Sequence, residues 1–102
     1  MKKVPEPSVA LLITNSNAAI YIAIENAEEI ITYAPEWSIG YLRLGNLLHM
    51  QGKQSAAISL YEKALMKISG GDPGYQQLIQ DKRNAEEKSK RYVDMISTLA
   101  FG

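Results

Sequence analysis

Apolar residues between Ile39 and Ile68 recur at the spacing of two consecutive amphipathic helices, and this stretch limits the fold more than any other part of the chain. The first run ends at Gln51-Gly52, where glycine can adopt the left-handed conformation found just after a helix. The second run ends at Ser69-Gly70-Gly71. Its shared face consists of Ala57, Tyr61, Ala64, Leu65 and Ile68. The pattern predicts two antiparallel helices within residues 38–69, joined by a tight turn.

Two small residues, Gly45 and Ala57, are expected on the facing sides of these helices. A larger side chain at either position would hold the two backbones apart, so we predict close packing there. Replacing Ala57 with leucine should overpack the contact and cost about 1–3 kcal/mol of stability.

Eight residues of this stretch follow a repeating pattern when Ser38 is counted as position 1 of a 34-residue unit. At positions 4, 7, 8, 11, 15, 20, 24 and 27 stand Tyr41, Leu44, Gly45, Leu48, Gly52, Ala57, Tyr61 and Ala64. This order resembles the tetratricopeptide repeat. There are two departures, because Leu48 stands where tyrosine is expected and the terminal proline is displaced to Pro73. The inserted residues 69–72 lengthen the loop after the second helix.

The residues before Ser38 keep the same register only in the second half of their unit. Ala23 and Pro35 fall on positions 20 and 32. Between them, the inner face of a predicted helix is formed by Ile24, Ala27, Ile30 and Ile31. The resemblance therefore implies a degenerate repeat over residues 4–37 and a clear repeat over 38–71. The implied fold is all-α, with helical hairpins in a short right-handed superhelical stack.

The uncharged segment Pro7–Ile24 superficially suggests a signal peptide or a membrane span. The polar run Thr14-Asn15-Ser16-Asn17 divides this segment, and four hydrogen-bonding side chains at mid-depth would be costly in lipid. We expect two buried helical segments joined by a turn, and no association with a membrane.

Residues 72–102 are expected to form a long C-terminal capping helix and an apolar tail. Asp72-Pro73 suits an N-cap followed by proline at the first helical position. Eight of the eleven residues from Asp81 to Arg91 are charged, which is typical of a solvated helix. Such a polar helix can close the last apolar face of a repeat array.

Apolar residues return after Arg91. The candidates for interaction in this tail are Tyr92, Met95, Ile96, Leu99 and Phe101. Three interpretations stay open: the tail folds back onto the core, it continues into a further unit, or it binds a partner, which includes a second copy of the chain. Residues 93–101 also faintly resemble the start of an F-box, the ubiquitin-ligase adaptor motif, with Leu99-Ala100 in place of the expected Leu-Pro.

The tetratricopeptide resemblance implies a concave face lined by repeat positions 2, 5, 6, 9, 12 and 13. In the clear repeat these positions are Ile39, Leu42, Arg43, Asn46, His49 and Met50. Arg43 can bind a peptide carboxylate through its planar guanidinium, and Asn46 can donate to and accept from an extended peptide backbone. Residues 35–43 are similar to the third repeat of the carboxylate-clamp co-chaperones, where an arginine matches Arg43. The clamp is incomplete, because Ile39 replaces its lysine and Val9 replaces an asparagine.

The composition excludes several classes of function. The 102-residue chain has no cysteine, and 11 basic residues balance 11 acidic ones. It therefore offers no disulfide, zinc-finger or iron–sulfur framework, and its zero net charge argues against a nucleic-acid partner. The single histidine, His49, has no cysteine or acid pair nearby in sequence that would suggest a metal or general-base site. We expect a non-enzymatic intracellular domain, cytoplasmic or nuclear, without cofactor or bound metal.

The sequence thus predicts a single-domain protein-interaction module that binds a peptide or helix of a partner protein in its concave groove. Three alternatives remain. The first is the tetratricopeptide part of a larger F-box-type adaptor, and the second is a co-chaperone with an incomplete clamp. The third is a structural domain that self-associates through its tail as a homo-oligomer.

Overall fold

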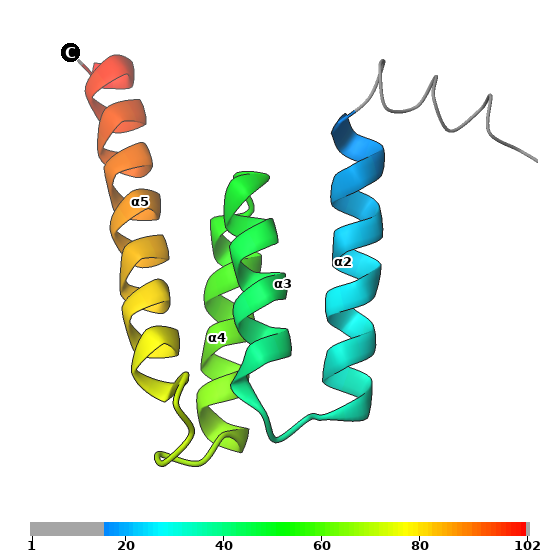
Figure 1. Cartoon of the computed structure of the whole chain (residues 1–102). Coiled ribbons are helices and arrows are strands. Elements are labelled where there is room, and N and C mark those ends of the chain that lie inside the picture. Colours follow the sequence, from blue (N-terminus) through cyan, green and yellow to red (C-terminus); the bar gives the residue numbers. More distant parts are fainter. Residues whose placement is uncertain (1–15, 102) are drawn as a thin grey trace, which may run out of the picture.

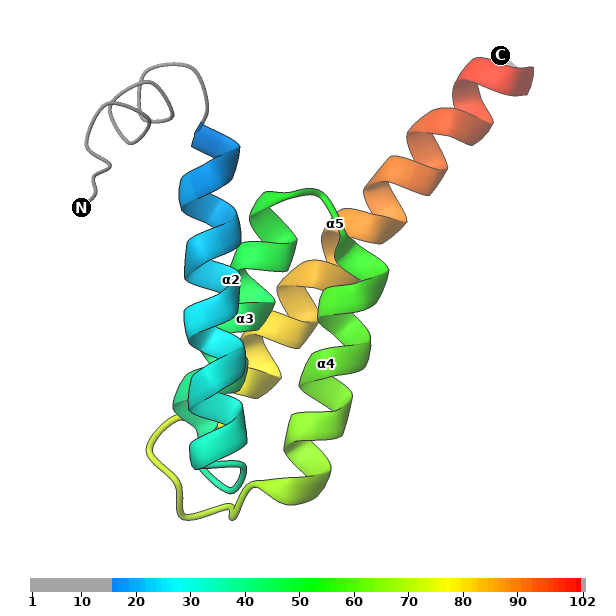
Figure 2. The same ribbon diagram turned by 90° about the vertical axis from the view of Figure 1, so that its right-hand side faces the viewer.

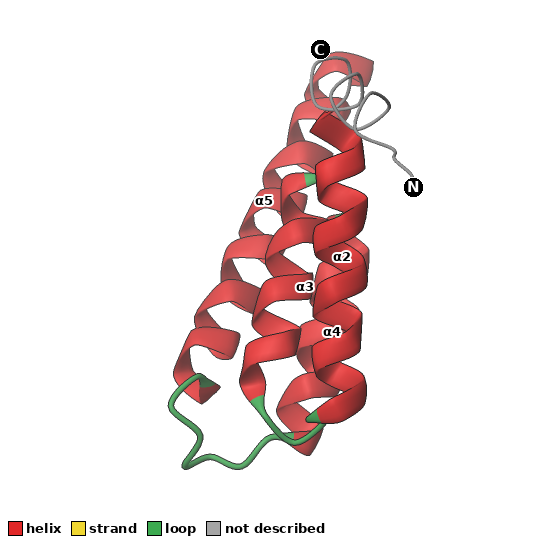
Figure 3. Ribbon diagram, turned by 45° about the vertical axis from the view of Figure 1, so that its right-hand side comes forward, coloured by secondary structure: helices red, strands yellow, loops and turns green. Residues whose placement is uncertain are grey.

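The computed structural model describes residues 16–101, which form four helices and no strand (Figure 1). In chain order these helices are α2 (Ser16–Tyr33), α3 (Ser38–Met50), α4 (Gln54–Lys67) and α5 (Tyr75–Phe101). Short loops connect them (Figure 3). The all-α prediction is confirmed for this part of the chain, and none of its helices is long and apolar enough to cross a membrane.

The hairpin of α3 and α4 lies where the sequence predicts it. Gly52 follows α3 with a φ of 81°, in the left-handed region. Its N–H donates to the carbonyl of His49 at 3.0 Å, and the N–H of Lys53 donates to the carbonyl of Leu48 at 2.9 Å. These two bonds form a Schellman motif, which satisfies carbonyls that the end of α3 leaves free.

The core lies between α3, α4 and the first half of α5. Its buried members are Tyr41, Ala57, Tyr61, Ala64, Ile68, Leu78 and Ala85. Gly45 is buried as well, and a Cβ atom on it would overlap the ring of Tyr61. The small residues Gly45 and Ala57 therefore let α3 and α4 approach closely, as predicted.

Helix α2 packs against α3 and against no other described helix. Ala27 is buried at this contact, and a Cβ atom on Gly40 would come within 2.7 Å of the Cγ1 of Ile31. The expectation of buried segments is wrong for the start of α2, because Tyr21 and Ile22 are 64% and 58% exposed. The first helix of the degenerate repeat, the start of the expected turn and Val9 lie outside the described residues.

Helix α5 differs from the prediction at both of its ends. It begins at Tyr75, since Pro73 and Gly74 belong to the preceding turn, in which the N–H of Tyr75 donates to the carbonyl of Asp72 at 3.0 Å. Beyond Arg91 the helix continues unbroken and projects past the α3–α4 turn (Figure 2). The interpretation in which the tail folds back onto the core is therefore wrong.

A structural recurrence links the start of α5 to the start of α3. Gly40-Tyr41 and Leu44 recur 34 residues later as Gly74-Tyr75 and Leu78. Both tyrosines and both leucines contribute to the core or pack against it, and a Cβ atom on either glycine would collide with a neighbouring helix or loop. The first half of α5 thus shares the Gly-Tyr-x-x-Leu pattern of α3 and the packing of these residues.

Candidate partner-binding surface

Helix α3 lies between α2 and α5, and the surface is hollowed on both of its sides. The hollow toward α2 has a volume of about 270 Å³ and is lined by Ala23, Asn26, Ala27, Arg43, Asn46 and Leu47. Toward α5, a hollow of about 100 Å³ is lined by Asn46, His49, Tyr61, Asp81 and Asn84. A third, of about 520 Å³, is lined by His49, Gln80, Arg83, Asn84, Glu87, Lys88 and Arg91. The first and second hollows share Asn46, and the second and third share His49. We call the continuous surface that they form the groove.

Three of the six residues predicted for the concave face line the groove. Arg43 faces the α2 side, His49 faces the α5 side, and Asn46 borders both. Arg43 and Asn46 are exposed and His49 is half-buried, so all three are accessible to a ligand.

The other three predicted residues lie elsewhere on α3. Leu42 is half-buried and packs against the core. Met50 is 64% exposed at the end of α3, and it lines neither side of the groove. Ile39 lines a separate hollow near the start of α3. The structure therefore does not gather the six residues into one site.

Helix α5 contributes groove residues that the sequence analysis missed. Gln80, Arg83 and Asn84 occupy positions 9, 12 and 13 of a 34-residue unit counted from Asp72. Asn46 and His49 occupy positions 9 and 12 of the preceding unit. The recurrence of Gly-Tyr-x-x-Leu is the sequence signal that could have identified these residues.

The α5 side of the groove is polar and carries both signs of charge. Arg83, Lys88 and Arg91 stand against Glu87 and Asp81. Burial, together with the nearby negative charge of Asp81, raises the pKa of Tyr61 to about 12. The floor of this side is therefore an uncharged phenol at neutral pH.

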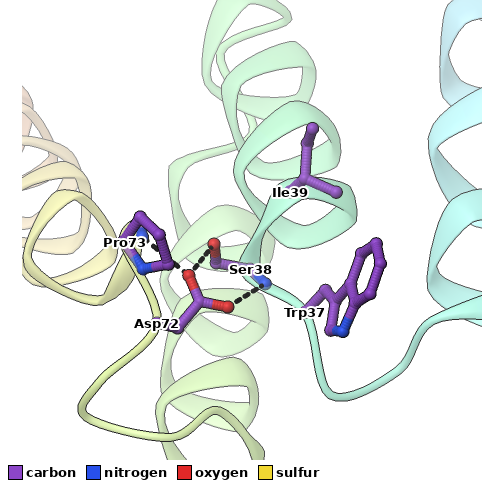
Figure 4. Close-up of a pocket in the computed structure, with 6 residues that line it drawn as sticks. Trp37, Ser38, Ile39, Asp72 and Pro73 are labelled. Atoms are coloured by element: carbon purple, nitrogen blue, oxygen red, sulfur yellow. Dashed lines mark hydrogen bonds between the residues drawn. The ribbon is translucent and has the colours of Figure 1, made fainter.

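The separate hollow, of about 360 Å³, lies where the loop before α5 meets the start of α3 (Figure 4). Its apolar part comes from Trp37, Ile39 and Pro73, and Trp37 is 64% exposed. Its polar part is the carboxylate of Asp72, which accepts a hydrogen bond from the Ser38 hydroxyl at 2.5 Å and one from the Ser38 N–H at 3.1 Å.

The Asp72 carboxylate has a structural role at this junction. It also accepts a bond from the N–H of Gly74 at 2.6 Å, so it ties the loop before α5 to the first turn of α3. The N-cap residue of α3, Trp37, offers no side-chain bond. Asp72 supplies the missing acceptor for the N–H of Ser38, which lies 34 residues before it. The bonds from Ser38 and Gly74 hold the pKa of Asp72 below its usual value.

The predicted tail residues lie on the projecting end of α5. Tyr92, Met95, Ile96 and Leu99 are 61%, 53%, 45% and 77% exposed. Phe101 is the last residue of α5, and its side chain lies outside the described part of the structure. The predicted tail surface is thus distinct from the groove.

No family model matches the chain, and no solved structure does. A curated protein of Saccharomyces cerevisiae, small glutamine-rich tetratricopeptide repeat-containing protein 2, is 30% identical over 77 residues, or 76% of this chain. The chain is similar to a tetratricopeptide repeat protein. It spans about a fifth (22%) of the length of that relative. This similarity and the all-helical arrangement fit a tetratricopeptide-like fold, whereas nothing in the comparisons supports an F-box-like start at residues 93–101.

Proposed function

We propose that this chain is a non-enzymatic protein-interaction module that binds a segment of a partner protein in the groove across α2, α3 and α5. The observation that carries the proposal is the pair of hollows that meet at Asn46, because they make one continuous accessible surface. The similarity to a tetratricopeptide repeat protein supports a protein partner in general. In this proposal the four described helices belong to a right-handed tetratricopeptide-type stack.

The size and polarity of the groove favour an extended peptide as the bound segment. Packed helices lie about 8–10 Å apart, so a groove crossing three of them is roughly 20 Å wide. An extended chain rises about 3.3 Å per residue, which gives a bound segment of about six residues. Asn46, at the centre, can pair with the donor and the acceptor of a peptide backbone. Arg43 and Arg83 can bind polar side chains near the two ends of the peptide.

The groove does not favour a two-cation carboxylate clamp around Arg43. The position of the clamp lysine is held by Ile39, which lines a different hollow. The other basic residues that line the groove, such as Arg83, lie on the α5 side, whereas Arg43 lies on the α2 side. We therefore expect peptide binding that does not depend on a free terminal carboxylate.

A selected peptide can test this proposal. Peptides chosen from a random phage-displayed library on the immobilised chain would be synthesised with a fluorophore, and their dissociation constants measured by fluorescence anisotropy. The Arg43→Ala, Asn46→Ala double variant should bind at least about tenfold more weakly, since hydrogen bonds to charged groups contribute about 1.5–3 kcal/mol. Ser59→Ala with Lys63→Ala is the matched control, because both residues are exposed on α4 and outside the groove.

The outcomes separate the proposal from its alternatives. Equal affinity of the groove variant and the wild type, with unchanged helicity by circular dichroism, would show that the groove is not the binding surface. Loss of binding when the peptide's terminal carboxylate is amidated would instead support the incomplete clamp. Loss in the α4 control variant alone would move the site to the opposite side of the hairpin.

A further inference from the structure

One face of α5 is buried along its first half and uncovered along its second. Leu78 and Ala85 are fully buried in the core, and Ser89 is half-buried on the same face. The same face continues through Tyr92, Ile96 and Leu99. From Ala85 through Ser89 to these three residues, the sequence spacing alternates between four and three. This is the spacing of a coiled-coil seam. We call Tyr92, Ile96 and Leu99 the tail strip.

This face of α5 is covered only as far as α4 extends. Helix α4 begins at Gln54, and a hollow of about 470 Å³ marks the place where its contact with α5 ends. This end hollow is lined by Gly52, Gln54, Ser55, Lys88, Ser89 and Tyr92. Beyond it the tail strip projects clear of the other described helices (Figure 2), which explains why its residues are 45–77% exposed.

We propose that the tail strip is covered by the tail strip of a second copy of this chain, in an antiparallel pair of α5 helices. In the register that places Tyr92 against the partner's Ile96, two-fold symmetry places Ile96 against the partner's Tyr92. The same register brings the partner's Leu99 opposite Ser89, at the mouth of the end hollow. One arrangement thus covers both strips and fills both hollows.

Three observations favour a second copy over an unrelated helix. A seam with alternating steps of three and four residues fits a helix with the same spacing, and the second copy supplies one. No charged residue lies on this face between Ser89 and Leu99, because Lys90, Arg91 and Asp94 all fall on other sides of the helix, so self-pairing opposes no like charges. The α3–α4 hairpin also adjoins this face only at the end hollow, beyond which α5 projects past it (Figure 2), so the overlap is accessible to a second chain.

The extent of the overlap sets the expected strength. Two helix segments of about three turns each bury on the order of 1,000 Å² in total, the lower bound for a specific interface. The dimer should therefore be weak, with a dissociation constant of roughly 10–1,000 μM, and in exchange with the monomer. The proposal does not rest on the groove, because the groove residues of α5, apart from Lys88, lie on another face of that helix.

Sedimentation velocity on the full chain over a wide concentration range tests the proposal. The mean molar mass should rise from that of the monomer toward that of the dimer as concentration increases. Ile96→Asp should weaken dimerisation at least tenfold, because it places a charge at the centre of the seam in both copies. Ser97→Asp is the matched control, since it adds the same charge outside the seam and should leave dimerisation unchanged.

Disulfide cross-linking tests the register, because the chain has no cysteine of its own. A mixture of Tyr92→Cys and Ile96→Cys chains should form more cross-linked dimer than either variant alone. Equal yields from all three samples would overturn the register. The proposal would be overturned if the wild type stayed monomeric at about 1 mM, the upper end of the expected range of roughly 10–1,000 μM. It would also be overturned if the Ile96→Asp variant dimerised like the wild type. Circular dichroism of each variant would check that the overall helix content is unchanged.

Discussion

Gly45 is a position where a single methyl group should disturb the fold. It lies in the middle of α3, and a Cβ atom placed on it would overlap two carbons of the Tyr61 ring and lie 2.6 Å from the hydroxyl oxygen. Tyr61 is only 2% exposed, so its ring has little room to move away. Gly45→Ala should therefore push α3 and α4 apart.

Two opposing effects set the magnitude of the change in stability. Overpacking a buried contact costs about 1–3 kcal/mol, and overlap with several atoms of a rigid ring suggests the upper half of that range. Replacing glycine by alanine inside a helix returns about 1 kcal/mol through helix propensity. We expect a net loss of about 1–2 kcal/mol, or a fall of about 5–15 °C in Tm for a domain of this size.

Urea unfolding followed by far-UV circular dichroism would measure this loss, and a double-mutant cycle would assign it to Tyr61. In a Tyr61→Leu background the ring is absent, so Gly45→Ala should become neutral or stabilising by up to about 1 kcal/mol. Gly70→Ala is the control, because no atom lies near its Cβ position. If Gly45→Ala left the wild type as stable as before, the close contact between α3 and Tyr61 would be refuted.

Three other substitutions test the fold. Ala57→Leu should cost about 1–3 kcal/mol in urea unfolding, because Ala57 is fully buried, and an unchanged midpoint would contradict the close packing. Asp72→Asn should lower Tm at neutral pH. The pKa of Asp72 is lowered in the folded state, so the carboxylate contributes stability that is present above its ordinary pKa of about 3.9 and is lost below it. The Tm of the variant should therefore fall less steeply than that of the wild type between neutral and acid pH. The raised pKa of Tyr61 contributes stability that is complete below about pH 10 and is lost as pH rises to about 12. Tyr61→Phe should reduce this loss of stability at alkaline pH. If stability fell equally steeply with pH in the variant and the wild type, Tyr61 would not be the group responsible.

The hairpin of α3 and α4 could be predicted because its signals are local. Apolar spacing defined the two helices, Gly52 marked the turn, and small residues marked the close contact. Each of these features acts within one helix or between neighbouring helices. The apolar residues after Arg91 are equally plain in the sequence, but local signals could not decide whether that tail would fold back onto the core.

The missed features depend on residues far apart in sequence. The Asp72 carboxylate bonds to Ser38 across 34 residues, so local capping rules assigned it to the next helix alone. The groove residues of α5, such as Arg83, were assigned to a solvated capping face because charge dominates that segment. Their role depends on which side of α5 meets α3. The recurrence of Gly74-Tyr75 and Leu78 indicates that side, whereas the charge pattern does not.

The two proposed surfaces lie on different sides of α5, and this separation makes a further prediction. At 3.6 residues per turn, the direction of Gln80, Arg83 and Arg91 differs by roughly 130° from that of the tail strip. Covering the tail strip should therefore leave the groove open, so the coupling free energy between dimerisation and peptide binding should be close to zero. The dissociation constant of a groove-bound peptide should be the same for the wild type, measured at low and at high chain concentration, and for Ile96→Asp. If peptide affinity instead changed with chain concentration in the wild type but not in Ile96→Asp, Lys88, which lines both the groove and the end hollow, would be the first residue to substitute.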